Sequence, residues 1–265
     1  MKNVNLSVSI IAKNEEDRLP KTLKAIKDIA DEIIVVVDSS TTDKTAEIAR
    51  KYGAKVFIEN WKGYGKQKQS ALNKTQGKWI LFLDADEVVD DTLKKEIKKI
   101  VNSKDTKFNG YLIKRKMIYL GKPLKHIWKE DLSLRLVRRE ANPRWIGDIH
   151  EKLEIDGKIG IIEKGYLLHY SYRSLKDHLE KTINYAYLSA LDFYKKRKKF
   201  SFLKLIFNPM WTFFKAYILK RGCLDGIRGL IISFSYFVNA FCKYAFLWYF
   251  YFKEREESSI KENKR

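Results

Sequence analysis

The sequence predicts an α/β fold, in which a parallel sheet covered by helices is followed by a smaller mixed or antiparallel sheet and by C-terminal amphipathic helices. In residues 1–105, short apolar runs alternate with helical patterns, which is typical of βαβ units. The runs are nearly continuous in Val, Ile, Leu and Phe, as expected of strands that are buried on both faces. After His169 the apolar residues recur at three- and four-residue steps, so the chain becomes helical there.

We expect one catalytic domain over residues 1–170, divided into halves at residues 1–105 and 106–170. In the first half the predicted strands are Leu6–Ala12, Ile33–Val37, Lys55–Ile58 and Trp79–Leu83. In the second half they are Tyr111–Tyr119, Leu132–Val137, Lys152–Ile155 and Lys158–Ile162. Asp156-Gly157 predicts a hairpin between the last two strands, because both positions tolerate positive φ.

Residues 171–252 form a helical region that we expect to associate with a membrane. Pro209 and Gly222 are expected to divide it into segments, and polar residues interrupt its longest apolar run, Gly229–Phe252. A spanning helix needs about 20 mainly apolar residues, so this run favours amphipathic helices that lie in the interface of an anionic membrane. The tail, residues 253–265, is charged and is expected to be disordered.

Charge and cysteine content narrow the class of protein. The 265 residues contain 53 Lys and Arg against 33 Asp and Glu, a net charge of +20 that favours anionic partners. The two cysteines, Cys223 and Cys242, lie far apart and predict no disulfide. No secretion signal is recognised at the start, so we expect a cytoplasmic protein attached to the inner face of the cell membrane. The basic and aromatic residues are mixed with long aliphatic runs, which suits lipid better than nucleic acid.

The motif Asp84-Ala85-Asp86-Glu87 follows an apolar strand directly. In extended geometry, side chains two apart point the same way, so Asp84 and Asp86 are expected to converge on one cation. Such a site lies at the carboxyl edge of the sheet, where ligands of open α/β sheets bind. A divalent metal, Mg²⁺ or Mn²⁺, would there stabilise a departing diphosphate. The alternative is that the two carboxylates only cap the following helix.

Two other predicted strands end in polar residues at this edge. Ala12 leaves room for a flat base, and Asn14 and Glu15 are suited to read the edge of the base or the ribose. Asp38 is expected to hold the base or ribose, as acidic residues do in nucleotide-binding α/β folds. Taken singly, each of these residues is more often an ordinary helix cap.

The loop Gly63-Tyr64-Gly65-Lys66-Gln67-Lys68 opens a predicted helix. Backbone amides at such a helix start, together with a lysine, are suited to bind phosphate. Gly65, Gln67 and Lys68 are therefore candidate contacts of a nucleotide-sugar.

In this order, the motifs resemble those of the family 2 glycosyltransferases, which have the Rossmann-like GT-A fold. The resemblance covers about the first two-thirds of the chain, and is greatest to the lipopolysaccharide-core β-glucosyltransferase-like branch, through Gly63 to Lys68, Asp84 to Glu87 and His150-Glu151. It implies contacts from Ala12, Asn14, Glu15 and Asp38 to uridine and ribose. It also implies that Asp84 and Asp86 bind metal and diphosphate, and that the anomeric centre is inverted.

Inversion by a single displacement requires a base that takes the proton of the acceptor hydroxyl. The candidate carboxylates are Glu151, Asp131 and Asp148, with Glu151 first because the His-Glu pair ends a strand region and would place His150 near the metal or diphosphate. Family members often show a Glu-Asp pair as the base motif, and Asp131 in Glu130-Asp131 is its possible equivalent. His169 is interpreted as a buried core histidine, with a metal or phosphate ligand as the alternative.

The sequence thus predicts a metal-dependent inverting transferase. We expect it to move a sugar from a nucleotide-sugar, with a UDP-sugar first, to a lipid-linked or glycan acceptor of the cell envelope such as lipopolysaccharide core. One alternative is a polyprenyl-phosphate glycosyltransferase, and another is a basic membrane- or nucleic-acid-binding protein without catalysis. A sugar nucleotidyltransferase is disfavoured, because the loop after the first strand is acidic at Glu15, Glu16 and Asp17 where a triphosphate cradle would be basic.

Overall fold

The computed structural model describes residues 4–103, 105–147 and 151–262, with side chains to residue 257. The chain forms two compact units. The first consists of Met1–Ile118 and Glu130–Ser171, and the second of Tyr119–Lys129 and Tyr172–Arg265. The segment Tyr119–Lys129 therefore belongs to the second unit, although the chain before and after it belongs to the first.

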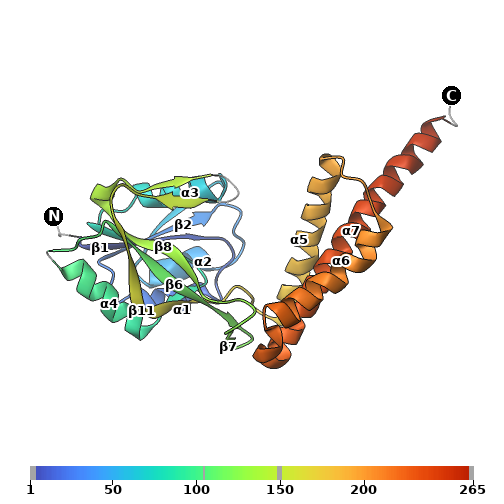
Figure 1. Ribbon diagram of the computed structural model, residues 1–265. Helices are drawn as coiled ribbons and strands as arrows, with labels where there is room; N and C mark the ends of the chain where they lie inside the picture. The colour runs from blue at the N-terminus through green and yellow to red at the C-terminus, as the bar shows by residue number, and fades with distance from the viewer. Residues whose placement is uncertain (1–3, 104, 148–150, 263–265) are drawn as a thin grey trace. The chain divides into compact units, whose positions relative to one another are not determined.

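A mixed sheet forms the centre of the first unit (Figure 1). Its strands are β1 (Leu6–Ala12), β2 (Glu32–Asp38), β3 (Lys55–Glu59), β4 (Trp79–Asp84), β5 (Glu87–Val89), β6 (Gly110–Tyr119), β7 (Lys122–Pro123), β8 (Asp131–Arg138) and β11 (Ile159–His169). The order along the sheet is β3-β2-β1-β4-β8-β6-β11-β5, with β7 beside β6. The first four strands in this order are parallel, whereas β8 is antiparallel to both of its neighbours. A second sheet contains only β9 (Arg144–Ile146) and β10 (Lys152–Glu154) among the described residues.

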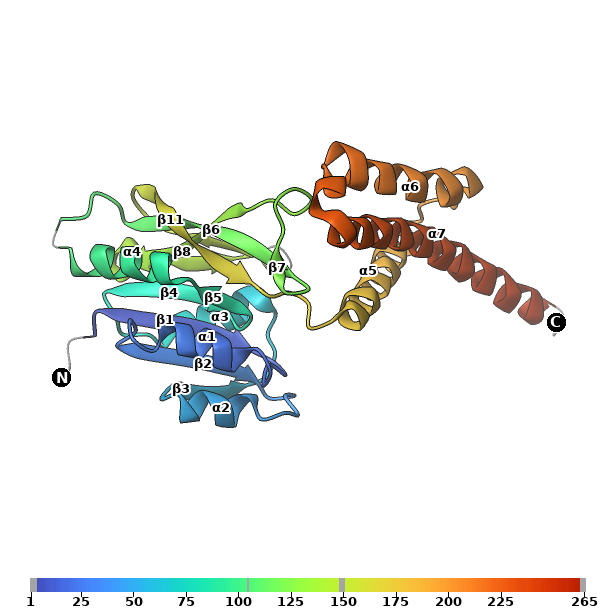
Figure 2. The same cartoon turned by 90° about the horizontal axis from the view of Figure 1, so that it is seen from below.

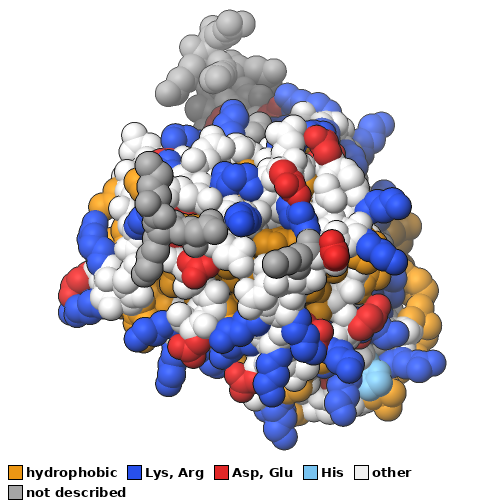
Figure 3. All heavy atoms as spheres, turned by 90° about the vertical axis from the view of Figure 1, so that its left-hand side faces the viewer, with side chains coloured by type: hydrophobic (Ala, Val, Ile, Leu, Met, Phe, Trp, Pro, Cys, Tyr) orange, Lys and Arg blue, Asp and Glu red, His pale blue; other side chains and the backbone are white. Residues whose placement is uncertain are grey.

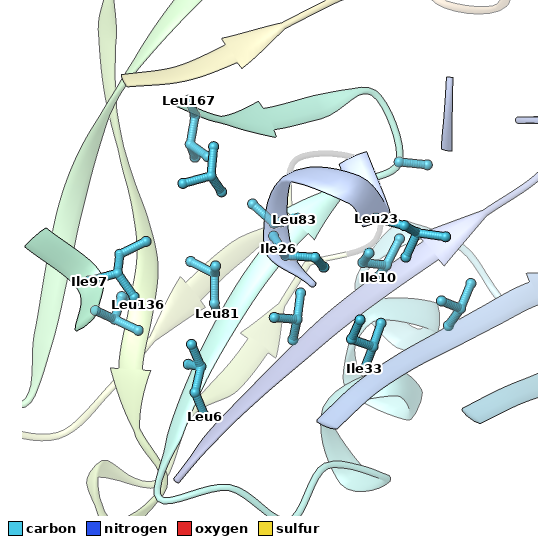
Figure 4. Packing of buried hydrophobic residues seen from close by; sticks show 14 of the residues in the cluster. Leu6, Ile10, Leu23, Ile26, Ile33, Leu81, Leu83, Ile97, Leu136 and Leu167 are labelled. Atoms are coloured by element: carbon cyan, nitrogen blue, oxygen red, sulfur yellow. The ribbon is translucent and has the colours of Figure 1, made fainter. Parts of the chain in front are cut away.

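Helices cover both faces of the parallel half, which explains the continuous apolar strands. On one face, α1 (Leu19–Ile26) and α4 (Asp91–Asn102) bury the alternate residues of β1, β2 and β4. Figure 4 shows this layer, where Leu23 and Ile26 of α1 meet Ile10 and Leu83. On the other face, α3 (Tyr64–Asn73) covers the intervening residues of β2 and β4. The helix α2 (Thr45–Lys51) packs against α1 and β3, and its Ala49 belongs to the core layer of α1. Both faces of each central strand are therefore buried.

The expected strands agree closely with the structure, and the expected GT-A-like arrangement of a main sheet with a small second sheet is present. The difference lies in how the later strands pair. The strands predicted at Tyr111–Tyr119 and Leu132–Val137 extend the main sheet as β6 and β8. The hairpin predicted at Asp156-Gly157 is wrong, because β10 and β11 belong to different sheets, although Gly157 does have a positive φ of 98°. A turn signal sets local backbone geometry and does not decide which strands pair.

The second unit is helical. It contains α5 (Leu175–Lys195), α6 (Phe202–Phe214), a π-helical turn (Lys215–Leu219), a short 3₁₀ turn (Gly222–Asp225) and α7 (Gly226–Glu262). Both α5 and α6 pack along α7, as Figure 2 shows. The expected break at Pro209 is wrong, because α6 continues through this residue. A proline inside a helix removes one backbone hydrogen bond, and here the ring is buried.

The helix α7 continues to Glu262 and so includes much of the charged tail. The segment Gly222–Glu257 is long and apolar enough to cross a membrane by length and composition alone, with a mean hydropathy of 1.5 in its best window. Within that window, 33% of the residues are buried inside the protein. Among the described residues this is the one such segment, which is weak evidence for a membrane span.

The positive charge is widely spread over the surface. On the face in Figure 3, Lys and Arg side chains occur across the whole surface, with Asp and Glu among them and apolar side chains between. The net charge of +20 is therefore not gathered into one patch on this face.

Candidate active site

The motif Asp84 to Glu87 bends at its centre. The strand β4 ends at Asp84, Ala85 and Asp86 form a turn, and Glu87 begins β5. The extended geometry assumed for this motif is therefore not present. Because β5 pairs with β11, Glu87 lies opposite His169, and the backbone N–H of Tyr170 donates to the carbonyl of Asp86 at 2.9 Å. The turn thus brings the acidic motif next to a histidine far away in sequence.

Asp84 lies between two cations. Arg135 Nη2 is 2.8 Å from Asp84 Oδ2, and Lys68 Nζ is 3.1 Å from Asp84 Oδ1. Burial disfavours the charged carboxylate, but the positive charges of Arg135 and Lys68 outweigh it and hold the pKa of Asp84 well below its ordinary value. Asp84 is therefore a carboxylate, as a ligand of a metal or a partner of a cation must be.

Asp86 has a different set of neighbours. Arg18 Nη1 lies 3.1 Å from Asp86 Oδ2, and His169 Nε2 lies 3.5 Å from Asp86 Oδ1. Burial raises its pKa, whereas the hydrogen bond and charge of His169 and the charge of Arg18 lower it, and the net result is a pKa below the ordinary value. Because His169 contacts Asp86, the alternative interpretation of His169 as a site residue accounts for its position better than a core role.

A chain of alternating charges connects these groups. The guanidinium of Arg135 also contacts Glu87 Oε1 at 2.6 Å, and Arg115 Nη1 lies 3.3 Å from the same oxygen. Arg115 in turn holds Asp131 through two contacts, at 3.1 and 2.7 Å. Glu87 and Arg135 have exposed side-chain fractions of 0% and 4%, so the centre of this chain is withdrawn from solvent. Buried charges of this kind are tolerated only when they are paired.

On the other side of Asp84, Lys68 connects it to Glu151. The distance from Lys68 Nζ to Glu151 Oε1 is 2.9 Å, and the same ammonium lies 4.8 Å from the ring centroid of Trp145. The structure therefore brings two of the three candidate bases, Asp131 and Glu151, into one network with Asp84. The third candidate, Asp148, and the expected metal neighbour His150 lie outside the described residues.

The glycine loop, Gly63 to Lys68, packs against the chain at Gly147 and Glu151. A β-carbon on Gly65 would lie 2.1 Å from the carbonyl oxygen of Gly147, so only glycine fits this position. Gln67 is 1% exposed, and within the described part of the chain both polar atoms of its amide lack a hydrogen-bond partner. Gly65 thus has a packing role, whereas Gln67 has unused hydrogen-bonding capacity beside Lys68.

Further unpaired donors lie near Asp84. Considering the described residues alone, Arg135 Nε and Trp145 Nε1 are buried without an acceptor. Both residues line a small cavity together with Lys68 and Asp84. Buried polar groups are nearly always satisfied by protein, water or ligand, so these two donors have unused hydrogen-bonding capacity next to Asp84.

The expected nucleotide contacts gather at the ends of β1 and β2. Ala12 ends β1 and is buried, in register with Val37 of β2. Asn14 has a positive φ of 52°, and its side-chain oxygen accepts from the backbone N–H of Thr42 at 2.9 Å. The structure therefore uses Asn14 to connect the loops that follow the two strands.

Asp38 and Glu15 each pair with a neighbouring cation. Asp38 is 2% exposed, and its carboxylate accepts the backbone N–H of Ser40 at 2.9 Å and lies 3.1 Å from Lys13 Nζ. The Ser40 hydrogen bond is the largest influence on Asp38 and lowers its pKa, with Lys13 acting in the same direction. Glu15 binds Arg18 with distances of 2.5 and 2.6 Å. Arg18 thus joins the end of β1 to Asp86.

Sequence reasoning missed Arg18 and Arg115. Arg18 also donates to the backbone carbonyls of Tyr170 and Ser171, at 3.2 and 3.3 Å, so it connects three segments of the first unit. Arg18 lies one turn beyond Asn14 and Glu15, a spacing that would have indicated it once those residues were considered. No comparable signal marks Arg115, because its role depends on the pairing of β6 with β8.

A divalent metal at this edge would need substrate to complete its ligands. Asp86 and His169 offer oxygen and nitrogen ligands side by side, and Asp84 adds a second carboxylate at the same edge. Within residues 4–103, 105–147 and 151–257 no three His, Cys, Asp or Glu side chains are grouped to hold an ion by themselves. Mg²⁺ is commonly bound by one or two carboxylates together with substrate phosphates, so an incomplete protein ligand set is compatible with such a site.

The first unit is an open α/β sheet with acidic and basic side chains at the carboxyl ends of β1, β2 and β4, which is where ligands of such sheets bind. The glycosyl transferase family 2 model matches residues 7–143, which is more than half of the chain. The chain belongs to this family, and the expected GT-A fold is confirmed by the family and by the order of the sheet.

Related proteins cover nearly the whole chain. An uncharacterised glycosyltransferase of Rickettsia typhi is 32% identical over 91% of this chain and 85% of its own length. The lipopolysaccharide core biosynthesis glycosyltransferase LpsC of Rhizobium meliloti is 30% identical over 89% of both chains. Among solved structures, residues 1–349 of TarS from Staphylococcus aureus match with 17% identity and a TM-score of 0.48, covering 87% of this chain and 89% of that one. The relatives from Rickettsia typhi and Rhizobium meliloti therefore align with about nine-tenths of this glycosyltransferase.

Proposed function

We propose that this glycosyltransferase moves a sugar from a nucleoside-diphosphate sugar, with UDP as the nucleotide, to a hydroxyl of a cell-envelope acceptor such as lipopolysaccharide core, and inverts the anomeric centre. The single observation that carries the proposal is the cluster at the end of β4, where Asp84 and Asp86 lie among Lys68, Arg18 and Arg135. The 30% sequence identity to LpsC, over 89% of both chains, supports lipopolysaccharide core as the class of acceptor.

The cluster is suited to a diphosphate leaving group. Asp86 and His169, with Asp84, are the side chains that would hold Mg²⁺ or Mn²⁺, and such an ion supplies positive charge to the departing diphosphate. Lys68 and Arg18 border the same carboxylates and are placed to neutralise phosphate oxygens. Ala12, Asn14 and Asp38 lie at the ends of the adjacent strands, where the base and ribose would bind.

For the base, accessibility puts Asp131 first and Glu151 second, the reverse of the order that the sequence alone suggested. An acceptor hydroxyl must reach the base to within hydrogen-bond distance. The side chain of Asp131 is 54% exposed, whereas Glu151 is 19% exposed and is held by Lys68. Burial raises the pKa of Asp131, but the hydrogen bonds and charge of Arg115 outweigh it and lower the pKa, so the side chain is an ionised carboxylate at neutral pH.

Matched variants separate the two candidate bases. If Asp131 is the base, Asp131→Asn lowers the turnover of acceptor by about 10²-fold or more and leaves the binding of UDP unchanged. Glu151→Gln then lowers turnover less and acts through donor affinity, because it alters Lys68. The opposite pattern would assign the base to Glu151. Thermal unfolding of both variants checks that the loss is not due to misfolding.

The donor is tested with a panel of nucleotide-sugars. We expect slow hydrolysis and an upward thermal shift with UDP-sugars in the presence of Mn²⁺, and smaller effects with GDP-, CMP- or dTDP-sugars. An equal response to all nucleotides would exclude recognition of uridine by the ends of β1 and β2. A polyprenyl-phosphate acceptor, the second candidate, is tested by adding it to the same assay beside a lipopolysaccharide core acceptor.

We propose that the protein works at the cytoplasmic face of the cell membrane, where lipid-linked acceptors are made available. The helical second unit, with large apolar side chains exposed on α6 and α7, supports this location. Flotation of the full-length protein with anionic vesicles tests it, and recovery of all the protein in the soluble fraction would contradict it.

A further inference from the structure

Helix α6 exposes its apolar face, whereas Asn208 and Thr212 contact α7. Seven large apolar side chains of this 13-residue helix are exposed. They are Phe202, Leu203, Ile206, Phe207, Met210, Trp211 and Phe214, with exposed fractions between 42% and 65%. Their spacing of one, three and four residues places all of them on one side of the helix. A helix that only packs in a water-soluble protein has the opposite arrangement.

The inner side of α6 carries the polar groups. Asn208 donates to the hydroxyl of Tyr244 on α7 at 2.8 Å, and Thr212 donates to the backbone carbonyl of Tyr236 at 3.3 Å. Pro209 is buried between them. These contacts fix the rotation of α6 on α7, so its apolar face cannot turn inward without breaking them. The contacts between α6 and α7 therefore keep the apolar face of α6 exposed.

The charges around this face match an anionic surface. From residue 193 to residue 224 the chain carries nine Lys and Arg residues and no Asp or Glu. Two of the nine are paired outside this range, Lys196 with Asp192 and Arg197 with Glu254. Lys204 is exposed and lies beside Trp211 when α6 is viewed along its axis. Lys215, which directly follows the last residue of α6, is also exposed. Lysine and tryptophan at the border of an apolar face are typical of helices that lie at the level of lipid headgroups.

We propose that α6 is an in-plane membrane anchor, whose exposed apolar face enters the boundary between headgroups and acyl chains of an anionic bilayer. The proposal rests on the membrane location proposed above, but not on the reaction. The length of α6, 13 residues, is too short to span a bilayer, which needs about 20 residues. Its apolar face, one-sided and bordered by lysine, suits insertion parallel to the surface.

The test is flotation of the full-length protein with vesicles of phosphatidylcholine alone or of equal parts phosphatidylcholine and phosphatidylglycerol. We expect binding to the anionic vesicles, and weaker binding in about 1 M salt, where the Debye length is about 3 Å. Phe207→Glu is expected to reduce bound protein by about tenfold or more, because it removes a large apolar group and adds a charge to the inserted face.

Two controls keep the test specific. Ile161→Glu makes the same change at an exposed apolar residue of β11 in the first unit, with an exposed fraction of 43%, and is expected to leave binding unchanged. Phe207→Leu keeps an apolar side chain and is expected to retain most of the binding. Circular dichroism and thermal unfolding confirm that each variant is folded.

The outcomes are distinct. Equal flotation of Phe207→Glu and Ile161→Glu would overturn the proposal, as would a concentration-dependent dimer in sedimentation that Phe207→Glu dissociates without changing vesicle binding. Donor hydrolysis without vesicles is measured on the same samples and is expected to be equal in all three variants. Absence of hydrolysis in the unmodified protein, with flotation as expected, would contradict the proposed reaction and leave the anchor intact.

Discussion

Arg135 is the residue on which the charge network of the first unit depends most. It is 4% exposed and contacts Asp84 at 2.8 Å and Glu87 at 2.6 Å. The substitution Arg135→Met keeps the length of the side chain and removes its charge. The buried carboxylate of Glu87 and the partly buried carboxylate of Asp84 then lose a shared partner, although Asp84 keeps Lys68 and Glu87 keeps Arg115.

The magnitude follows from the burial of these partners. Breaking a buried ion pair by removing one side costs about 3–5 kcal/mol, and the remaining partners place this case near about 3 kcal/mol. For a unit of this size, such a loss corresponds to a decrease in melting temperature of about 6–12 °C. The double variant Arg135→Met/Glu87→Gln is expected to recover more than about 1 kcal/mol, since Gln keeps the hydrogen bond from the backbone N–H of Asp84 and removes one unpaired charge.

Urea and thermal unfolding followed by circular dichroism measure both variants against a matched control. Lys114→Met on β6 removes an ion pair with Glu163 of β11, in which the two side chains are 25% and 70% exposed, and is expected to cost less than about 1 kcal/mol. If Arg135→Met costs no more than Lys114→Met, the buried charge chain does not stabilise the fold and the reasoning is refuted.

Three further predictions concern other parts of the chain. Hydrogen bonds from Lys74, Lys62 and Ser70 outweigh the opposing effect of burial and lower the pKa of Glu59 from 4.5 to about 2. Its contribution to stability, up to about 3 kcal/mol before screening by solvent, is complete above pH 4.5 and is lost as the pH falls towards 2. Glu59→Gln is therefore expected to flatten the acid unfolding curve in this window, and an unchanged curve contradicts the assignment. Gly65→Ala forces a β-carbon against the carbonyl of Gly147 and is expected to destabilise the first unit by about 1–3 kcal/mol in urea unfolding and to lower donor hydrolysis; a fully stable and active variant would show that the contact relaxes freely. Tyr119→Phe leaves buried His178 without its 2.6 Å hydrogen bond and should cost about 1–3 kcal/mol, checked by thermal unfolding, whereas a cost near zero would indicate that water replaces the hydroxyl.

The parts of the fold that depend on local pattern were predictable from the sequence. The strand Leu6–Ala12 and the helix beginning at Leu175 agree with the structure because a continuous apolar run and a helical period are visible within a few residues. The pairing of the later strands was not predictable in the same way. Whether β6 and β8 extend the main sheet depends on contacts between distant segments, for which one sequence holds no signal.

The same division applies to the candidate site. Asp84, Asp86 and Lys68 were identified because they occur in short motifs at the ends of predicted elements. His169 and Arg115 reach the cluster through pairing of β11 with β5 and of β6 with β8, so their roles follow from tertiary structure. The turn at Ala85 and Asp86 could not be predicted from the sequence either. Asp84 and Asp86 have the same spacing in sequence whether the backbone between them is extended or forms a tight turn.

The central claim is that the acidic residues at the end of β4 hold a nucleoside diphosphate together with a divalent ion. Calorimetric titration of UDP into the protein, with and without Mn²⁺, tests it most directly, using Asp86→Asn and the surface control Asp91→Asn, whose side chain is 92% exposed. We expect binding that requires Mn²⁺, is abolished in Asp86→Asn and is unchanged in Asp91→Asn. Binding of UDP that is equally strong without the ion and in Asp86→Asn would contradict the account.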